Sequence, residues 1–313
     1  MLNLLGKRYY FFALSALIII PAMFIIAFNG LPLAVDFKGG TLLELQFPTP
    51  ALPSTDQVTE IYTKYGFNEV TVQTAMSTDN ERNILIIRSP FMDDVVKGQV
   101  VEDLKTAANV SEVTINNFQS VGPTIAKEVA QRAILAVFFA ALAVVIYITY
   151  AFRGVNHAFR YGVCAVLAMG HDVLIVLSLA AYGGLLFGWQ VDSMFLTALL
   201  TVIGFSVQDK IVVFDRIREN SNIYRKLEFE KLANHSIVQT LQRSINTQLM
   251  TVEFMLLALA LFGGVTIREF SIILLVGLLS GTYSSIFIAA PALVVWENKE
   301  WRTWFHKNKS AEA

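Results

Sequence analysis

The sequence predicts an α-helical membrane protein with six transmembrane helices and one external α+β domain between the first two. The chain has 313 residues, of which 55% are hydrophobic and 16% charged, and its mean hydropathy is +0.54. Such a composition is typical of a protein with several membrane spans. Between the first two apolar runs, residues 29–130 carry 13 acidic and 7 basic residues. The polarity of this stretch favours a soluble domain.

The first apolar run covers 20 residues, 9–28, directly after Lys7 and Arg8. That length is enough to cross a hydrocarbon core of ~30 Å at ~1.5 Å per residue. No small-residue cleavage site of a signal peptide follows it. We therefore expect residues 1–28 to form a cytoplasmic N-terminus and an uncleaved first span.

Residues 29–131 are expected to form the external domain. Extended and helical patterns alternate there in the order β-α-β-β-α-β, which is typical of a ferredoxin-like split βαβ domain. The expected strands and helices cover, in chain order, residues 42–47, 54–65, 70–74, 84–87, 93–107 and 113–118.

Five further spans are predicted within a membrane body of residues 132–297. Gly277 and Gly281 in the last of them have a GxxxG spacing, which permits close helix packing. Polar residues 215–242 are expected to form a cytoplasmic loop with an interfacial helix, and residues 298–313 a cytoplasmic tail. The five spans cover residues 133–152, 162–186, 193–214, 245–262 and 270–295.

The distribution of Lys and Arg predicts how the chain is oriented in the membrane. Nearly all basic residues of the short connections fall on one side, whereas Arg268 is the single cation in the short connections of the other. Because basic connections stay in the cytoplasm, both termini are expected to be cytoplasmic and the acidic domain external.

Two charged residues inside predicted spans indicate proton coupling. Asp209 lies six residues before Asp215 at the inner end of the fourth span, and Arg243 opens the fifth span from the same side. Because an ionised side chain inside a bilayer costs at least ~2.5 kcal/mol, we expect Asp209 and Arg243 to meet. Protonation of the carboxylate would release the guanidinium and move one helix against another. A static ion pair that serves packing is the alternative.

Four other polar residues lie within spans. An ionised Lys210 inside a span is expected to face the protein interior, and the alternative is that its long stem carries the ammonium group to the cytoplasmic interface. His171 and Asp172 lie near the middle of the third span and are candidates for proton transfer, although His171 alternatively hydrogen-bonds a neighbouring helix. Glu253 in the fifth span is either a second relay site or faces an attached subunit.

The sequence contains no HExxH, GxSxG or GxxxxGK[ST] motif, so metalloprotease, serine hydrolase and P-loop chemistry are not indicated. We expect no enzymatic activity, no cofactor and no metal. The single cysteine, Cys164, offers neither a disulfide nor a thiolate metal site. No basic stretch with interleaved aromatic residues indicates nucleic acid.

Seven short motifs spread over nearly the whole chain match one known family. They are VDFKGGT at 35–41 with Asp36, Gly39 and Gly40; VGPTIAKE at 121–128 with Gly122 and Pro123; GHDV at 170–173; IGFSVQDKIVVFDRIREN at 203–220 with Gly204, Arg216 and Arg218; SIVQTLQRSINT at 236–247; FGG at 262–264; and GTYSSIF at 281–287. In this order they resemble the SecF family of bacterial protein export, within the resistance–nodulation–division superfamily.

The resemblance implies a non-enzymatic subunit of the bacterial cytoplasmic (inner) membrane. Such a subunit works with SecD and uses protons to pull unfolded exported polypeptide outward, after SecA has pushed it through SecYEG; YajC is a further implied partner. The family's coupling pair falls on Asp209 and Arg243. Lys210 stands where the family has Thr or Ser, and Glu253 is an acid not associated with the family. Coupling to sodium therefore stays open.

Two other functions were weighed. A proton-driven half-transporter of small hydrophobic substrates, as in other members of the superfamily, would have a much larger external domain. An intramembrane di-aspartyl protease would use Asp172 and Asp209, but Arg243 competes for the second acid.

Overall fold

The computed structural model describes residues 3–48, 52–76, 82–153, 158–248, 253–263 and 265–300. The described chain divides into two compact units. We call them the sheet unit, which contains Leu33–Leu135 and Gln190–Ser193, and the helical unit, which contains the remaining described residues. The sheet unit starts and ends a few residues later than the predicted domain, and it includes a short connection that the sequence did not assign to it.

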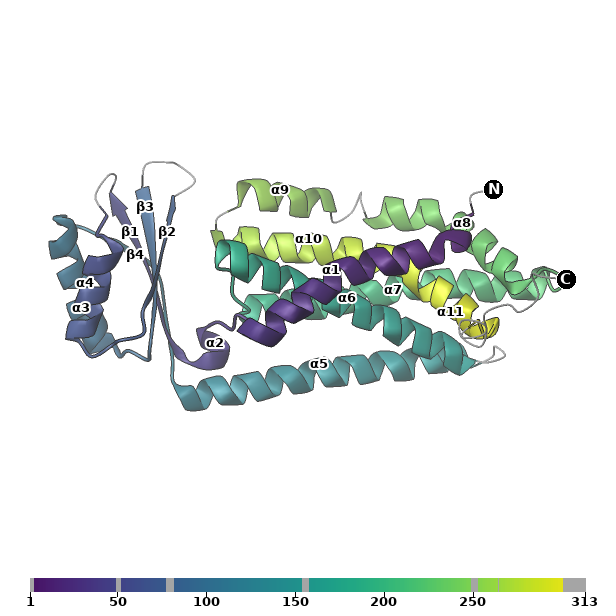
Figure 1. Cartoon of the computed structure of the whole chain (residues 1–313), viewed down its shortest axis with the longest axis horizontal. Coiled ribbons are helices and arrows are strands. Elements are labelled where there is room, and N and C mark those ends of the chain that lie inside the picture. The colour runs from purple at the N-terminus through teal and green to yellow at the C-terminus, as the bar shows by residue number, and fades with distance from the viewer. Residues whose placement is uncertain are drawn as a thin grey trace, which may run out of the picture. The chain divides into compact units, whose positions relative to one another are not determined.

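The sheet unit contains one sheet of four antiparallel strands. Helices α3 (Thr55–Lys64) and α4 (Asp94–Ala108) cover one of its faces (Figure 1). The elements follow as β1-α3-β2-β3-α4-β4, which is the predicted order, and a short helix, α2 (Val35–Lys38), precedes them. The strands pair in the order β2-β3-β1-β4 and are β1 (Gly40–Pro48), β2 (Thr71–Met76), β3 (Arg82–Ser89) and β4 (Thr114–Val121).

Alternation along β1 builds the core of this unit. Leu43, Leu45 and Phe47 are fully buried, since every second residue of a strand points to the same face. They pack with Tyr62 of α3 and Leu104 of α4. The hydrophobic period of two therefore fixes which face of the sheet the helices cover.

Both helices of the sheet unit begin at side chains that cap them. The Ser54 hydroxyl accepts from the backbone N–H of Gln57, and the Gln57 side chain in turn accepts from the backbone N–H of Ser54. The Asp93 carboxylate accepts from the backbone N–H of Val96 at the start of α4. These caps explain why both helices begin where the sequence predicts.

Polar contacts join α3 to α4. Lys64 Nζ and the Tyr65 hydroxyl donate to Asp103 Oδ2 at 2.8 Å and 3.0 Å. These hydrogen bonds, that from Lys64 first, lower the pKa of the Asp103 carboxyl. On the opposite face of the sheet, burial raises the pKa of Glu44.

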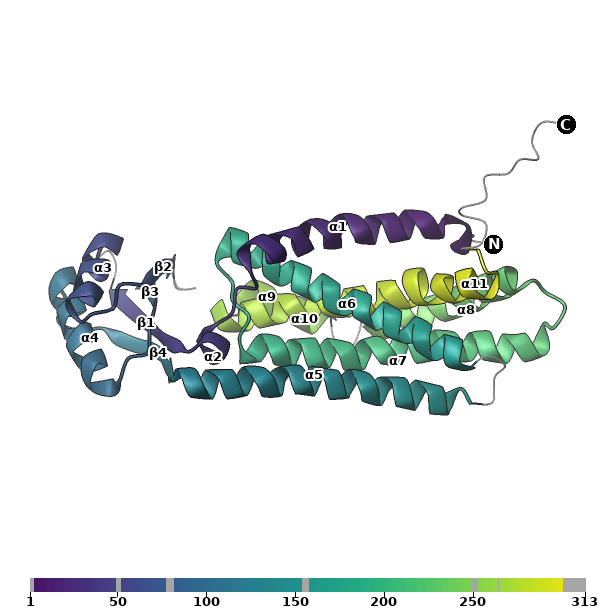
Figure 2. The same ribbon diagram turned by 60° about the horizontal axis from the view of Figure 1, so that its bottom comes forward.

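The helical unit consists of long helices that run side by side (Figure 1 and Figure 2). In chain order its elements are η1 (Leu5–Lys7), α1 (Arg8–Asn29), α6 (Ala158–Phe187), α7 (Ser193–Ile223), α8 (Phe229–Gln248), α9 (Phe254–Phe262), α10 (Val265–Ser284), the π-helical turn η3 (Ser285–Ala289) and α11 (Ala290–Glu297). Helix α5 (Pro123–Ala151) continues from the sheet unit into this unit.

Five stretches of the described chain are long and apolar enough to cross a membrane. They agree with the first, second, third, fourth and sixth predicted spans, and they are Leu5–Asn29, Pro123–Ala151, Phe159–Phe187, Ser193–Ile223 and Ile267–Glu297. The predicted fifth span, 245–262, coincides with the end of α8 and with α9, and residues 249–252 between them lie outside the described residues.

The segment 215–242, predicted to be a cytoplasmic loop with an interfacial helix, is mostly helical. Helix α7 continues to Ile223 and α8 begins at Phe229. Ion pairs one turn apart accompany the exposed extension of α7: Arg218 binds Asp215 at 3.2 Å, and Arg216 binds Glu219 at 2.6 Å. Such pairs stabilise helical backbone even where the sequence is polar.

Two glycines bring α10 close to α7, as the GxxxG spacing predicts. A Cβ atom on Gly281 would lie 3.3 Å from Ser206 Cα, and one on Gly277 would collide with the Val202 side chain. The absence of side chains at these positions lets the two helices approach. This close approach positions the polar site described next.

Candidate functional site

Asp172 on α6 is the centre of a hydrogen-bonded network between α6, α7 and α10. Its side chain is 0% exposed. Asp172 Oδ2 accepts from Lys210 Nζ at 2.7 Å, from Ser206 Oγ at 2.5 Å and from Ser284 Oγ at 2.7 Å, while Oδ1 accepts from Ser280 Oγ at 2.8 Å. Because these donors fill the carboxylate's acceptor sites, the ionised form of Asp172 is held firmly in place.

Lys210 is the buried counter-ion of Asp172. Its side chain is also 0% exposed, and its ammonium group donates to the main-chain oxygen of Ser206 at 3.2 Å and to the Ser206 hydroxyl. Lys210 therefore faces the protein interior, and the alternative in which it reaches the interface was wrong. The position one helical turn after Ser206 places Lys210 on the same face of α7, toward Asp172. There a buried opposite charge compensates the cost of leaving water.

His171 extends the network to α1. Its Nε2 lies 2.9 Å from Ser15 Oγ of α1, and its Nδ1 lies 3.1 Å from Asp172 Oδ1. The ring stacks on Tyr283, whose hydroxyl donates to the main-chain oxygen of Phe11 at 2.9 Å. His171 thus hydrogen-bonds a neighbouring helix, and its role in proton transfer stays a prediction.

Asp209 and Arg243 are not paired. Within the described part of the chain no ion pair joins them, and the buried Oδ2 atom of Asp209 has no hydrogen-bond partner. Asp209 is one residue before Lys210 and so lies about 100° around the helix from it, beside Thr282 of α10. Arg243 is exposed and lines a cavity of about 330 Å³ together with Asp215. The intramembrane ion pair of the described structure is that of Asp172 with Lys210, whereas Arg243 acts on Asp209 only by electrostatic attraction over a longer distance.

The other candidate residues lie apart from this network. Glu253 directly precedes α9, is 5% exposed, and has a buried Oε1 atom without a hydrogen-bond partner in the described structure. Asp215, Arg216 and Arg218 form ion pairs on the exposed side of α7. None of these side chains contacts Asp172 in the described structure.

The glycine and proline residues of the motifs matter for the conformation of the main chain. Gly39 and Gly40 have φ angles of +80° and +124°, in the region that favours glycine. Pro123 is the first residue of α5, where its missing N–H is not needed, and a Cβ on the preceding Gly122 would meet no atom within 4 Å. Gly204 on α7 likewise lies in open space.

The serines of the network were not among the site residues predicted from the sequence. Ser206 precedes Lys210 by four residues, and Ser280 precedes Ser284 by four. That spacing places each pair on one face of a helix and was a usable signal.

Within the described residues no group of three His, Cys, Asp or Glu side chains is suited to holding a metal ion. The arrangement combines one fixed intramembrane ion pair with one carboxyl group, Asp209, whose Oδ2 is unpartnered.

Comparison with known proteins identifies the family. Residues 100–299 match the family model "Protein export membrane protein SecD/SecF, C-terminal", and residues 24–51 match "SecD/SecF GG Motif". The protein translocase subunit SecF of Anaerolinea thermophila is 66% identical over 98% of this chain and 98% of its own length. That of Thermobaculum terrenum is 43% identical over 100% and 99%. The chain belongs to the SecF family of protein translocase subunits.

Solved structures of SecDF share the fold. SecDF from Thermus thermophilus, described as a translocon-associated membrane protein, has a TM-score of 0.79 and 30% identity over 95% of this chain. SecDF in a super-membrane-facing form has a TM-score of 0.66 and 30% identity over 97%. This SecF chain spans about 40% of the SecDF chains that it matches. Neither the half-transporter nor the protease alternative is favoured by these relatives.

Proposed function

We propose that this SecF chain works with a SecD partner and uses the proton-motive force to complete the export of polypeptides across the bacterial cytoplasmic membrane. It acts without chemistry of its own, on unfolded polypeptide that SecA and SecYEG deliver, and YajC is a further partner. Relatives named SecDF, in which a stretch similar to this chain is part of a longer protein, support the pairing with SecD.

The contrast between two intramembrane carboxyl groups carries the proposal. Asp172 is neutralised by Lys210 and bound by three serine hydroxyls, so it is a fixed anchor of the helices around it. Asp209, on the same helix as Lys210, has a buried oxygen that no donor satisfies in the described structure. A buried oxygen of this kind is costly while the group is charged, and binding a proton removes the charge. We therefore assign proton binding to Asp209.

Arg243 is the partner that the deprotonated form of Asp209 would attract. In the described structure the two do not form an ion pair, and Arg243 lines the cavity that also contains Asp215. Deprotonation would draw the guanidinium toward the carboxylate and so move α8 against α7. The described arrangement fits the state in which Asp209 is protonated.

The membrane topology belongs to the same proposal. In this topology the chain has six spans, and the fifth runs from the end of α8 to α9. Both termini are cytoplasmic and the sheet unit is external. Its four strands, in the order β2-β3-β1-β4 with two helices on one face, support a ferredoxin-like assignment for this domain.

Proton flux tests the proposal. The chain is reconstituted with its SecD partner in proteoliposomes, and internal pH is followed after a pH gradient is imposed. We expect Asp209→Asn to reduce the flux to that of protein-free vesicles while the folded protein remains, because the amide cannot exchange a proton. Asp94→Asn, an exposed position of the sheet unit, is the matched control and should leave the flux unchanged.

Two outcomes would contradict this assignment. Wild-type flux in Asp209→Asn would exclude Asp209 as the proton-binding group and direct the search to Asp172 and Glu253. Wild-type complex that carries sodium but no protons under matched gradients would overturn proton coupling itself.

A further inference from the structure

A short contact joins the segment after α1 to the connection before α7. Ala34 N–H donates to the main-chain oxygen of Val191 at 2.8 Å, and Leu33 pairs with Val191 as an isolated parallel bridge. Asp36 Oδ2 accepts from the Ser193 backbone N–H at 2.8 Å and from its hydroxyl at 2.6 Å. We call these two segments, Leu33–Asp36 and Val191–Ser193, the latch.

The latch holds the beginning of α7. Ser193 is the first residue of this helix, and its N–H is one of those that the helix itself leaves unpaired. The Asp36 carboxylate therefore acts as a cap supplied from elsewhere in the chain, at the helix end that favours a negative charge. The same unbroken helix of 31 residues carries Ser206, Asp209 and Lys210.

The residues that directly follow Asp36 pack closely against the sheet. Gly40 follows Asp36 by four residues, and a Cβ atom there would lie 2.7 Å from the main-chain oxygen of Ser89 at the end of β3. A Cβ atom on Gly39 would lie 3.2 Å from Pro123 Cα at the start of α5. The chain between Asp36 and β1 is therefore short and closely packed against the end of β3 and the start of α5, so we expect a movement of the sheet to displace Asp36.

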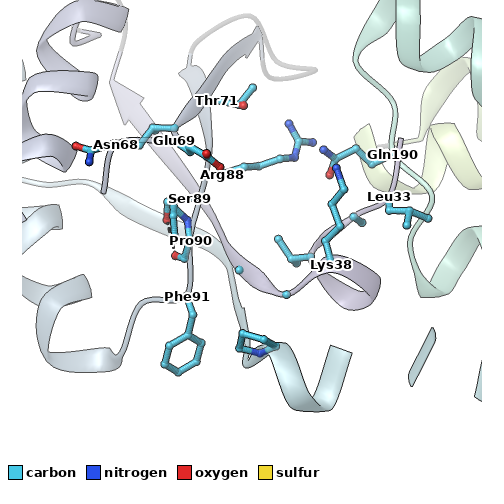
Figure 3. A pocket seen from close by; sticks show the side chains of 16 residues that line it. Leu33, Lys38, Asn68, Glu69, Thr71, Arg88, Ser89, Pro90, Phe91 and Gln190 are labelled. Carbon is cyan, nitrogen blue, oxygen red and sulfur yellow. Dashed lines mark hydrogen bonds between the residues drawn. The ribbon is translucent and has the colours of Figure 1, made fainter. Parts of the chain in front are cut away.

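The surroundings of the latch are open and polar. A cavity of about 720 Å³ within the sheet unit is lined by Lys38, Arg88 and Gln190, among others, and these three side chains point toward one another (Figure 3). Asp36 itself is half-buried and Ser193 is exposed. Replacing Asp36 therefore leaves no hole in a packed core, which makes the contact accessible to mutation without unfolding.

We propose that the latch transmits movement between the external domain and α7, with Asp36 as its positioning residue. The proposal rests on the proposed function, because α7 carries the group assigned to proton binding. Proton exchange at Asp209 shifts α7, and the shift reaches the sheet through Asp36 and the glycines that follow it. In the opposite direction, a load on the external domain acts on α7 through the same contact.

Separate measurement of proton flux and of export tests the latch. The complex with the SecD partner is reconstituted in proteoliposomes. The rate of proton flux and the rate of polypeptide export are then both measured. We expect Asp36→Ala to lower export several-fold while proton flux continues, because the two movements are no longer joined. Asp36→Asn retains an acceptor oxygen for Ser193 and should keep most of the export. Ser193→Ala, which keeps the backbone donor, should fall between them.

The controls distinguish the two proposals. Asp56→Ala, at an exposed position of the sheet unit, should leave flux and export unchanged. If the wild-type complex shows no proton flux, the proposed function is contradicted. If Asp36→Ala shows both the proton flux and the export of the wild type, only the latch is contradicted. Equal loss of flux and export in folded Asp36→Ala would also overturn the latch, because it indicates a general structural role.

Discussion

The residues of the Asp172 network show how a membrane protein keeps charges inside the bilayer. Two ionised groups, Asp172 and Lys210, are fully buried and lie 2.7 Å apart. Serine hydroxyls from α7 and α10 satisfy the remaining acceptor sites of the carboxylate. Breaking such a pair by removing one partner leaves an uncompensated buried charge, which is far more costly than removing both.

The difference between removing one partner of the ion pair and removing both can be tested by mutation. We expect Lys210→Met to destabilise the folded protein by about 3–5 kcal/mol, because Asp172 loses its counter-ion. Thermal unfolding in detergent, or the amount of folded protein recovered, measures the loss. The double variant Asp172→Asn with Lys210→Met removes both charges and should recover most of the stability. A single variant as stable as wild type would show that Asp172 is not ionised in the folded protein.

Helix packing decides where these residues can meet. Ser280 and Ser284 reach Asp172 from α10 while Gly277 and Gly281 of the same helix contact α7 at Val202 and Ser206. The close approach of α10 to α7 thus positions Ser206 and the α10 serines around a single carboxylate. Wider separation of these two helices would remove donors from Asp172.

A glycine substitution tests this packing at the scale of the element. We expect Gly277→Ala to destabilise the protein by about 1–3 kcal/mol, because the new methyl group collides with Val202. At Gly204 of α7 a Cβ meets no atom within 4 Å, so Gly204→Ala should be neutral or gain up to about 1 kcal/mol from helix propensity. Unfolding midpoints of the two variants in the same detergent make the comparison. Equal midpoints would mean that α10 does not pack against α7 through Gly277.

For the molecule as a whole, the distribution of charge predicts how the chain is oriented in the membrane. The sheet unit belongs to the acidic stretch of the chain, whereas basic residues gather near the ends of the helices and in the tail. Arg8 at the start of α1 binds Glu230 of α8 and Glu300 after α11, at 3.1 Å and 2.7 Å. These contacts bring the start of α1, the start of α8 and the end of α11 to the same end of the helical unit.

The orientation is testable by labelling of single cysteines. In a Cys164→Ala background, Glu112→Cys of the sheet unit should react with a membrane-impermeant maleimide added outside intact cells. Lys226→Cys, between α7 and α8, should react only after the membrane is permeabilised, because the proposed topology places this connection in the cytoplasm. The reverse pattern would invert the proposed topology, and equal labelling of both would contradict a single orientation.

Much of the architecture was predictable because it follows from local patterns. Alternation of Leu43, Leu45 and Phe47 predicts β1, and Ser54 predicts the start of α3, since both signals lie within a few adjacent residues. The apolar runs likewise predict the five spans described here. The extension of α7 to Ile223 was missed, because its polar composition resembles a loop, whereas in the structure Ile217 and Asn220 are buried and Asn220 Nδ2 donates to Ser236 Oγ of α8.

Two acids inside the membrane-spanning helices, Asp172 and Asp209, could be predicted from the sequence because they interrupt long apolar runs. Their partners could not be predicted, because partners depend on how the helices pack. The pairing of Asp172 with Lys210 depends on the rotation of α6, α7 and α10 about their axes, and a shift of one residue turns a helical side chain by about 100°. The contact of Asp36 with Ser193 joins residues 157 positions apart, so no local pattern contains it. Apolar composition therefore predicts which helices are buried in the membrane, whereas helix packing determines which polar side chains contact one another.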